Sequence, residues 1–278
     1  MRSNIISLAC LWLLAAPMAA QQNDHVALKI DVVAWGNEIK GLSFKPGSGK
    51  AAITALSFRY STPVTYSGPV VMEVYQSDNV TAAPVGPAVK YPAAGRLIPQ
   101  NPFGTGEAAD SSTNASPKQG LALELERRRK KEPTLVALAV LPGGDCRHAT
   151  VLLAPAEAGT FTSYVIDDDP SKLPVGQLRI HNLSPFLVAM RCNGEPARQL
   201  KTRDAILVPA VRDHLIYELA YKLDDVWNVQ ENNVIPVRPN EQTQIIILKS
   251  DHSFFLASDG SRSGFLQFIT LRRSPDAH

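Results

Sequence analysis

The chain has little charge for its size. Of its 278 residues, 19% are charged and 45% are hydrophobic, which is typical of a globular protein that forms a core and not of a disordered one. The formal net charge is only +2. A protein so close to neutral has no general electrostatic attraction to DNA, RNA or anionic lipid, so nucleic acid is not expected as a partner.

A hydrophobic run long enough to span a bilayer is also missing. The apolar run Ile5–Ala16 has the length of a signal-peptide core, roughly 7–15 residues, and falls short of the ~20 that a membrane span needs. Arg2 precedes this run, Pro17 breaks it, and the small residue Ala20 marks a cleavage site. We therefore expect residues 1–20 to be a cleaved signal peptide and the protein to be secreted, periplasmic or on the cell surface.

Cysteine is scarce as well. Cys10 lies inside the predicted signal peptide, so Cys146 and Cys192 are the only thiols of the mature chain. An oxidising compartment would permit them to pair, but pairing needs a Cα separation below about 7 Å, and the two residues fall in different predicted domains. A Cys146–Cys192 disulfide and two buried free thiols both stay open.

Helical periodicity over ten or more residues is absent, and alternation with a period of two dominates. The clearest apolar stripe comprises Leu215, Tyr217, Leu219, Tyr221 and Leu223. Glu218 and Lys222 alternate with this stripe, and we expect them to lie beside each other in water on the opposite face. Such alternation is typical of a half-buried strand. The sequence therefore predicts an all-β protein.

Two segments interrupt the strand pattern. Residues 77–120 are rich in proline and glycine and are predicted to be a flexible insertion. The acids Asp167–Asp169 followed by Pro170 end a strand and place a boundary near residue 172. The expected fold is two antiparallel β-sandwiches of the immunoglobulin-like kind, at 21–172 and 173–278, each with about seven short strands. The Cys…Trp…Cys pattern of antibody domains is missing, so that likeness is architectural.

Three segments carry a resemblance: Tyr66-Ser67-Gly68-Pro69, Val165-Ile166-Asp167-Asp168 and Pro174–Pro185. Together they resemble uncharacterised secreted bacterial proteins built from two β-sandwiches, over most of the mature chain. Within the third segment, Arg-x-x-Asn-x-Ser-Pro also resembles a domain of unknown function repeated in bacterial surface proteins. The resemblance implies the fold and export, and neither family brings an activity to carry over.

Recognisable catalytic motifs are missing. Gly47-Ser48-Gly49-Lys50 lacks the first glycine and the final Ser or Thr of a phosphate-binding loop, so a hairpin turn is expected at Pro46–Lys50. No Gly-x-Ser-x-Gly elbow occurs, and in Asp251-His252-Ser253 the triad residue types are adjacent, whereas triads assemble from distant segments. Cys146-Arg147-His148 places a thiol near an imidazole, but a nucleophile also needs an orienting group and a pocket, so turn residues are favoured there.

Metal-ligand spacing is equally absent. The six histidines include no His-x-x-x-His pair, and no Cys-x-x-Cys occurs. Asp167–Asp169 could offer oxygens to calcium, but the glycine and later glutamate of known calcium loops are missing, and a solvated domain junction is favoured. The same holds for Asp224 and Asp225. We expect no metal and no cofactor.

One strong charge run is present, and it reads Arg127-Arg128-Arg129-Lys130-Lys131. It follows Leu121, Leu123 and Leu125, which alternate with other residues, and it precedes the strand expected at Leu135–Leu141. We expect a solvated hairpin tip or approach to that strand. Contact with an anionic envelope polymer or partner, and a protease-sensitive site, are the alternatives.

The function favoured by these observations is an exported, non-enzymatic structural or protein-interaction module of the cell envelope or surface. Its partner would be another envelope or surface protein or a polymer. One alternative is a carbohydrate- or polymer-binding accessory protein that uses exposed Tyr60, Tyr66, Tyr75 or Trp227. A hydrolase with an unrecognised pair of carboxylates is less favoured, because the separation of such a pair is a three-dimensional property.

Overall fold

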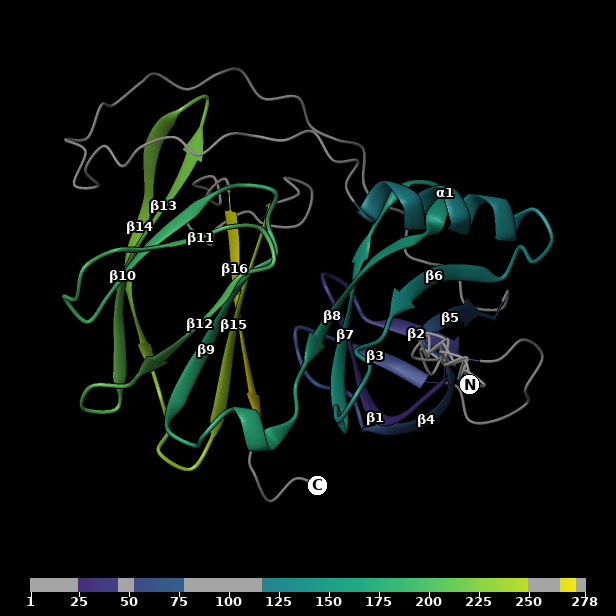
Figure 1. Cartoon of the computed structure of the whole chain (residues 1–278), viewed down its shortest axis with the longest axis horizontal. Coiled ribbons are helices and arrows are strands. Elements are labelled where there is room, and N and C mark those ends of the chain that lie inside the picture. Colours follow the sequence, from purple (N-terminus) through teal and green to yellow (C-terminus); the bar gives the residue numbers. More distant parts are fainter. Residues whose placement is uncertain (1–24, 45–52, 78–116, 250–265, 274–278) are drawn as a thin grey trace, which may run out of the picture.

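The computed structural model describes residues 25–44, 53–77, 117–249 and 266–273. Most of them form strands in two units that lie side by side (Figure 1), which confirms the predicted all-β class. The predicted signal peptide, the turn at Pro46–Lys50, most of the insertion and Asp251-His252-Ser253 lie outside the described residues. Within the described ranges, no helix is both long and apolar enough to cross a membrane.

The first unit is built on one eight-stranded sheet, in the order β6-β5-β2-β3-β1-β7-β8 with β4 paired to β1. Its strands are β1 (His25–Ala34), β2 (Ile39–Ser43), β3 (Ile53–Ser57), β4 (Val64–Pro69), β5 (Val71–Gln76), β6 (Leu135–Val140), β7 (His148–Pro155) and β8 (Phe161–Asp167). The end strands β6 and β8 approach each other, because the Ser163 hydroxyl donates to the Leu138 carbonyl at 2.5 Å. The curled sheet encloses an apolar core that includes Ile30, Met72 and Val151.

This sheet is mixed, and the sequence predicted antiparallel pairing throughout. Strand β1 runs parallel to both β3 and β7. Its second half, Asp31–Ala34, is buried at every position, because both faces of the sheet are covered there. Continuous burial of this kind is typical of parallel strands.

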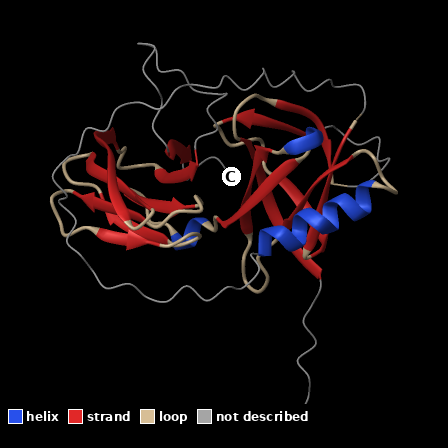
Figure 2. Ribbon diagram, turned by 90° about the horizontal axis from the view of Figure 1, so that it is seen from above, coloured by secondary structure: helices blue, strands red, loops and turns tan. Residues whose placement is uncertain are grey.

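A helix replaces the hairpin expected before Leu135. Helix α1 spans Pro117–Arg129 and lies across the strands of the first unit (Figure 2). Leu125 is buried on one side of it, while Leu123 points away and is 67% exposed. The alternation of three leucines was misread, because Leu121 and Leu125 are also four residues apart and share a helix face. Alanine, leucine, glutamate and arginine are strong helix formers.

The second unit is a sandwich of two four-stranded sheets, ordered β11-β10-β13-β14 and β12-β9-β15-β16. Its strands are β9 (Gln177–Asn182), β10 (Val188–Cys192), β11 (Arg198–Leu200), β12 (Ala205–Pro209), β13 (His214–Leu223), β14 (Val226–Pro236), β15 (Gln242–Lys249) and β16 (Leu266–Arg273). The inner faces share one core, which includes Leu178, Met190 and Ile247. The one-turn helices η1 (Glu157–Gly159) and η2 (Pro170–Lys172) flank β8.

Strand β13 tests the clearest sequence pattern. It is an interior strand, and the first three members of the predicted stripe are buried as expected: Leu215, Tyr217 and Leu219. Tyr221 is half-buried and Leu223 is exposed, because a β-bulge follows Leu219 and the hairpin turn follows Leu223. That turn is Asp224-Asp225, and both residues have positive φ, which a two-residue hairpin turn requires.

The expected side-by-side placement of Glu218 and Lys222 is wrong in detail. Glu218 lies 3.4 Å from Arg191 on β10, and Lys222 lies 2.9 Å from Asp225 in the turn. Each charge therefore pairs with a neighbour that the linear pattern does not show.

The two units share an apolar interface. Val33, Trp35 and Leu152 of the first unit pack against a row from the second: Leu183, Ile246, Leu248, Ile269 and Leu271. Ile246 and Leu248 alternate with Ile245 and Ile247, which face the sandwich core. Strand β15 is thus buried on both faces. In the described part of the chain, no strand ladder crosses residue 172, so side chains join the units.

Candidate functional site

A cluster of ionisable side chains lies buried where the two units meet. Asp31 on β1, His148 on β7 and Asp168 after β8 belong to the first unit, and Arg273 on β16 belongs to the second. His148 Nε2 lies 2.7 Å from Asp31 Oδ2. Arg273 Nη2 donates to the same Asp31 oxygen and lies 2.9 Å from Asp168 Oδ2. Because every member is less than a tenth exposed, these ion pairs cross the junction out of contact with water.

Polar neighbours complete the cluster around Asp168. Thr150 Oγ1 donates to Asp168 Oδ2 at 2.7 Å, and the Gln244 amide donates to the other carboxylate oxygen. The Arg273 guanidinium lies 4.3 Å from the ring centre of Tyr60. Burial raises the pKa of Asp168 above its usual range, although the nearby Arg273 opposes that change. Asp168 was expected in a solvated junction; it lies at the junction but is buried.

The groups of this cluster bond chiefly to one another. His148 and Arg273 engage Asp31, while Thr150, Gln244 and Arg273 engage Asp168. An acid–base catalyst must reach its substrate, and these side chains are covered by both units. Removing one partner would leave a buried charge without compensation. The cluster therefore fixes the orientation of the two units.

The two cysteines lie in separate cores, so the disulfide left open by the sequence is not formed in this structure. Both are free and buried, Cys146 among core residues of the first unit and Cys192 among those of the second. The Cys146 thiol donates to Asp167 Oδ1 at 3.3 Å, and burial raises its pKa to about 11. A thiol that stays protonated at neutral pH is a poor nucleophile. The His148 ring bonds to Asp31 through Nε2.

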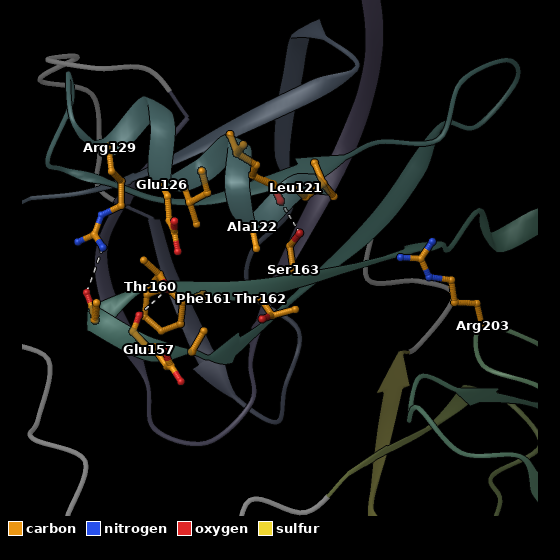
Figure 3. A pocket seen from close by; sticks show the side chains of 14 residues that line it. Leu121, Ala122, Glu126, Arg129, Glu157, Thr160, Phe161, Thr162, Ser163 and Arg203 are labelled. Atoms are coloured by element: carbon orange, nitrogen blue, oxygen red, sulfur yellow. Dashed lines mark hydrogen bonds between the residues drawn. The ribbon is translucent and has the colours of Figure 1, made fainter. Parts of the chain in front are cut away.

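A groove runs along β8 at the junction. One hollow of about 320 Å³ lies between α1 and β8 (Figure 3), and a second of about 530 Å³ lies between β8 and the second unit. They share Leu121, Ser163 and Arg203, so they form one groove. We call it the β8 groove.

The floor of the β8 groove is an edge strand. Within the described residues β8 pairs with β7 and with no other strand. The Asp168 N–H donates to the His148 carbonyl, which fixes the alternation of the ladder: Tyr164 and Ile166 bond to β7, whereas Ser163 and Val165 turn their backbone groups outward. Both outward-facing residues line the groove.

The walls hold three arginines. Arg129 of α1 donates to the Ala158 carbonyl at 3.1 Å, and Arg179 of β9 donates to the carbonyls of Asp167 and Lys172. Arg203 extends from the second unit toward the groove (Figure 3). No acidic side chain pairs with its guanidinium in the part of the chain that the structure describes.

The Arg-x-x-Asn-x-Ser-Pro segment organises this side of the junction. Arg179 holds the linker between the units, as described above. The buried Asn182 side chain donates to the Phe186 and Leu200 carbonyls and accepts from Ser184. The Asn182 carbonyl accepts from the Arg203 N–H at 2.6 Å. The sequence resemblance marks this segment, but its role at the junction could not be predicted, because that role depends on contacts with residues distant in the chain.

The basic run ends α1, so the predicted hairpin tip is wrong. Arg127 and Arg128 each lie 2.7 Å from Glu124, and Arg128 also lies 2.5 Å from Glu73. Cations are favoured in the last turn by the helix dipole. Lys130 and Lys131 follow the helix and are exposed. An anionic partner at these five residues stays a prediction.

The aromatic residues expected at the surface are mostly covered. Tyr66 and Tyr75 are buried, and Tyr60 lies under Arg273. Trp227 is half-buried over Ala189 and Ala220. These four residues therefore form no exposed row. No group of three or more His, Cys, Asp or Glu suited to a metal occurs among the described residues.

Comparison with protein-family models found no match, and no curated protein is significantly similar to the chain.

Proposed function

We propose that this protein is an exported, non-enzymatic interaction module of the cell envelope or surface, and that it binds an extended segment of a partner protein in the β8 groove. The observation that carries the proposal is an edge strand with outward-facing backbone groups at the floor of a groove built by both units. Export follows from the predicted signal peptide, and the intact mass of exported protein tests cleavage near Ala20.

Strand addition supplies the binding chemistry. The backbone groups of Ser163 and Val165 face away from β7. Strand β6 already lies close at Ser163, whose hydroxyl donates to the Leu138 carbonyl, so the outward groups of Val165 are the template for another strand. Main-chain hydrogen bonds give affinity in such complexes, while pockets for alternate side chains give specificity. The two hollows beside β8 supply those pockets, with apolar residues such as Leu121 and Leu183.

The fixed arrangement of the two units supports the same proposal. One wall of the groove comes from α1 and the other from β9 and the loop at Arg203. The buried ion pairs of Arg273 and the shared apolar interface hold these walls in one arrangement. A site that is already formed loses less conformational freedom on binding.

The test is a selection of random 12-residue peptides displayed on phage, with the folded protein as the target. We expect enriched peptides with alternating apolar residues. Val165→Pro should weaken their binding about tenfold or more, because it removes an outward N–H that one strong hydrogen bond would use. The change should leave the ladder to β7 intact, since proline is tolerated at outward positions of edge strands.

The matched control is Val234→Pro on β14. The Val234 N–H also points away from its ladder, toward the Asn233 side chain, and β14 is the edge strand of the other sheet. Peptide affinity should be unchanged by this variant. Failure to enrich any peptide, or equal losses from both proline variants, would refute binding in the β8 groove.

A further inference from the structure

Of the three arginines that line the β8 groove, Arg203 alone has neither an acidic nor a carbonyl partner at its guanidinium among the described residues. We infer that Arg203 makes the groove selective for partner segments that carry a carboxylate; this inference rests on the function proposed above. Arg203 lines both hollows, so its guanidinium can reach a segment that lies along β8.

The backbone of Arg203 is held in an unusual conformation. Its φ is +74°, in the left-handed region that residues with a side chain seldom occupy. The Arg203 N–H donates to the Asn182 carbonyl, and the neighbouring Asp204 carbonyl accepts from the Asn182 N–H at 2.9 Å. These two bonds fix the turn. Glycine would suit this φ better, and an arginine kept there despite the strain points to a use for its side chain.

The charges around the groove favour an anion near Arg203. Arg129 and Arg179 are occupied by main-chain carbonyls, and Lys172 is paired with Asp167. At the α1 end, Glu126 and Glu157 line the first hollow and would repel a carboxylate. A bound segment should therefore place its acid beside Arg203 and its apolar residues toward α1.

The neighbouring Tyr164 adds a neutral wall to this site. It is half-buried on β8, and burial raises its pKa above the usual value while the charge of Arg203 opposes that change. The phenol is therefore uncharged at neutral pH. A planar guanidinium beside a partly buried wall is suited to a carboxylate, because it donates two parallel hydrogen bonds.

A carboxylate can come from an Asp or Glu side chain or from the C-terminus of the partner. Fluorescence anisotropy on the selected peptides separates these sources. Each peptide is compared with a twin in which Asp or Glu is replaced by Asn or Gln, and with a twin whose C-terminus is an amide. The twin that loses affinity identifies the source.

The decisive variant is Arg203→Gly. It removes the guanidinium and relieves the backbone strain, so the thermal midpoint should stay equal or rise. Affinity for the acidic peptide should fall about tenfold, since a charge-assisted hydrogen bond is lost, while affinity for the neutral twin should not change. Arg203→Lys, which keeps the charge without the two-pronged geometry, should give an intermediate loss.

The outcomes separate this inference from the proposed function. If the peptides bind, are weakened by Val165→Pro, and are insensitive to Arg203→Gly, the groove is a strand-binding site and the role of Arg203 is refuted. If Arg203→Gly weakens acidic and neutral twins equally, the residue shapes the groove and does not select a charge. If no peptide is enriched, both the proposed strand binding in the β8 groove and the role of Arg203 are refuted.

Discussion

At the scale of single residues, His181 illustrates how burial at the junction sets the charge of a side chain. It lies within the segment Pro174–Pro185, and its Nε2 is 2.8 Å from Gln244 Oε1. Because the Gln244 nitrogen donates to Asp168, its oxygen must accept, so Nε2 of His181 carries the proton. Burial lowers the pKa of His181 to about 4.

This pKa predicts a loss of stability in mild acid. An unfolded histidine titrates near pH 6.5. Between about pH 6.5 and 4 the unfolded chain takes up a proton that the folded protein does not, so His181 destabilises the fold as the pH falls. The full difference is roughly 3 kcal/mol. Urea midpoints of the whole protein between pH 7 and 4.5 measure it.

The control for this prediction is His181→Gln, which keeps a donor for Gln244 and does not titrate. Its stability should fall less with pH than that of the unsubstituted protein. Asp168, whose raised pKa acts in the opposite direction, is common to both proteins and cancels in the comparison. Parallel curves for the two proteins would show that His181 is protonated equally in the folded and unfolded states.

Other residues of the junction show what local sequence can and cannot reveal. Asp167–Asp169 and Pro170 were predicted to end a strand, and β8 ends at Asp167. Asp31 lies between the core residues Ile30 and Val32 of β1, and its buried carboxylate is paired with Arg273, which lies 242 positions further along the chain. No local pattern encodes that pairing.

At the scale of elements, β13 offers a comparison between its two faces. Leu219 is fully buried in the sandwich core, whereas Glu218 is partly exposed beside Arg191. Leu219→Ala should cost about 2–5 kcal/mol of unfolding free energy, because it loses apolar contact and leaves a cavity. Glu218→Ala should cost roughly 0.5 kcal/mol or less, as surface changes usually do.

Denaturant midpoints of the two variants measure this difference, and the whole chain must be used. An isolated second unit would expose Ile246, Leu248, Ile269 and Leu271, which are buried against the first unit. A larger loss for Glu218→Ala than for Leu219→Ala would contradict the assignment of the inner face.

The alternation that identified β13 worked because it extends over five positions, and three of them reach the core. Before Leu135 the pattern covers only Leu121, Leu123 and Leu125, and such a short run fits a helix or a strand equally well. The helix forms because Leu121 and Leu125 pack on Tyr75, Leu135 and Leu138 of the sheet below. Tertiary contact therefore decided a case that the local pattern left ambiguous.

At the scale of the whole molecule, the all-β class was predictable from the sequence, and the pairing of the strands was not, in the second unit as in the first, because β9 and β15 also run parallel. Turn residues and alternation mark where strands begin and end. They do not show that β1 pairs in parallel with β3 and β7, because such pairing joins strands that are distant in sequence. The junction likewise depends on side chains from both halves.

The shared interface makes the two units thermodynamically dependent on each other. The apolar row from Ile246 to Leu271 and the ion pairs of Arg273 are buried only while both units are folded. Unfolding one unit would expose the facing surface of the other and leave Asp31 or Arg273 without its partner. We therefore expect both units to unfold in one cooperative transition.

Two of the three tryptophans allow this cooperativity to be measured in a protein that lacks residues 1–20 and with them Trp12, because Trp35 belongs to the first unit and Trp227 lies on β14 of the second. With Trp227→Phe the remaining Trp35 reports on the first unit and the interface, and with Trp35→Phe the remaining Trp227 reports on the second unit. The two urea midpoints should coincide once each substitution's own effect on stability is subtracted. Arg273→Met should lower both midpoints, by roughly 3–5 kcal/mol in unfolding free energy, since it leaves two buried carboxylates without their cation. The adjacent Arg272 is exposed and donates to the Pro236 carbonyl, so Arg272→Met should cost about 0.5 kcal/mol or less. Separate midpoints in the protein with Arg273 intact would mean that the units unfold independently, and equal losses from the two arginine variants would mean that the buried ion pairs do not stabilise the junction.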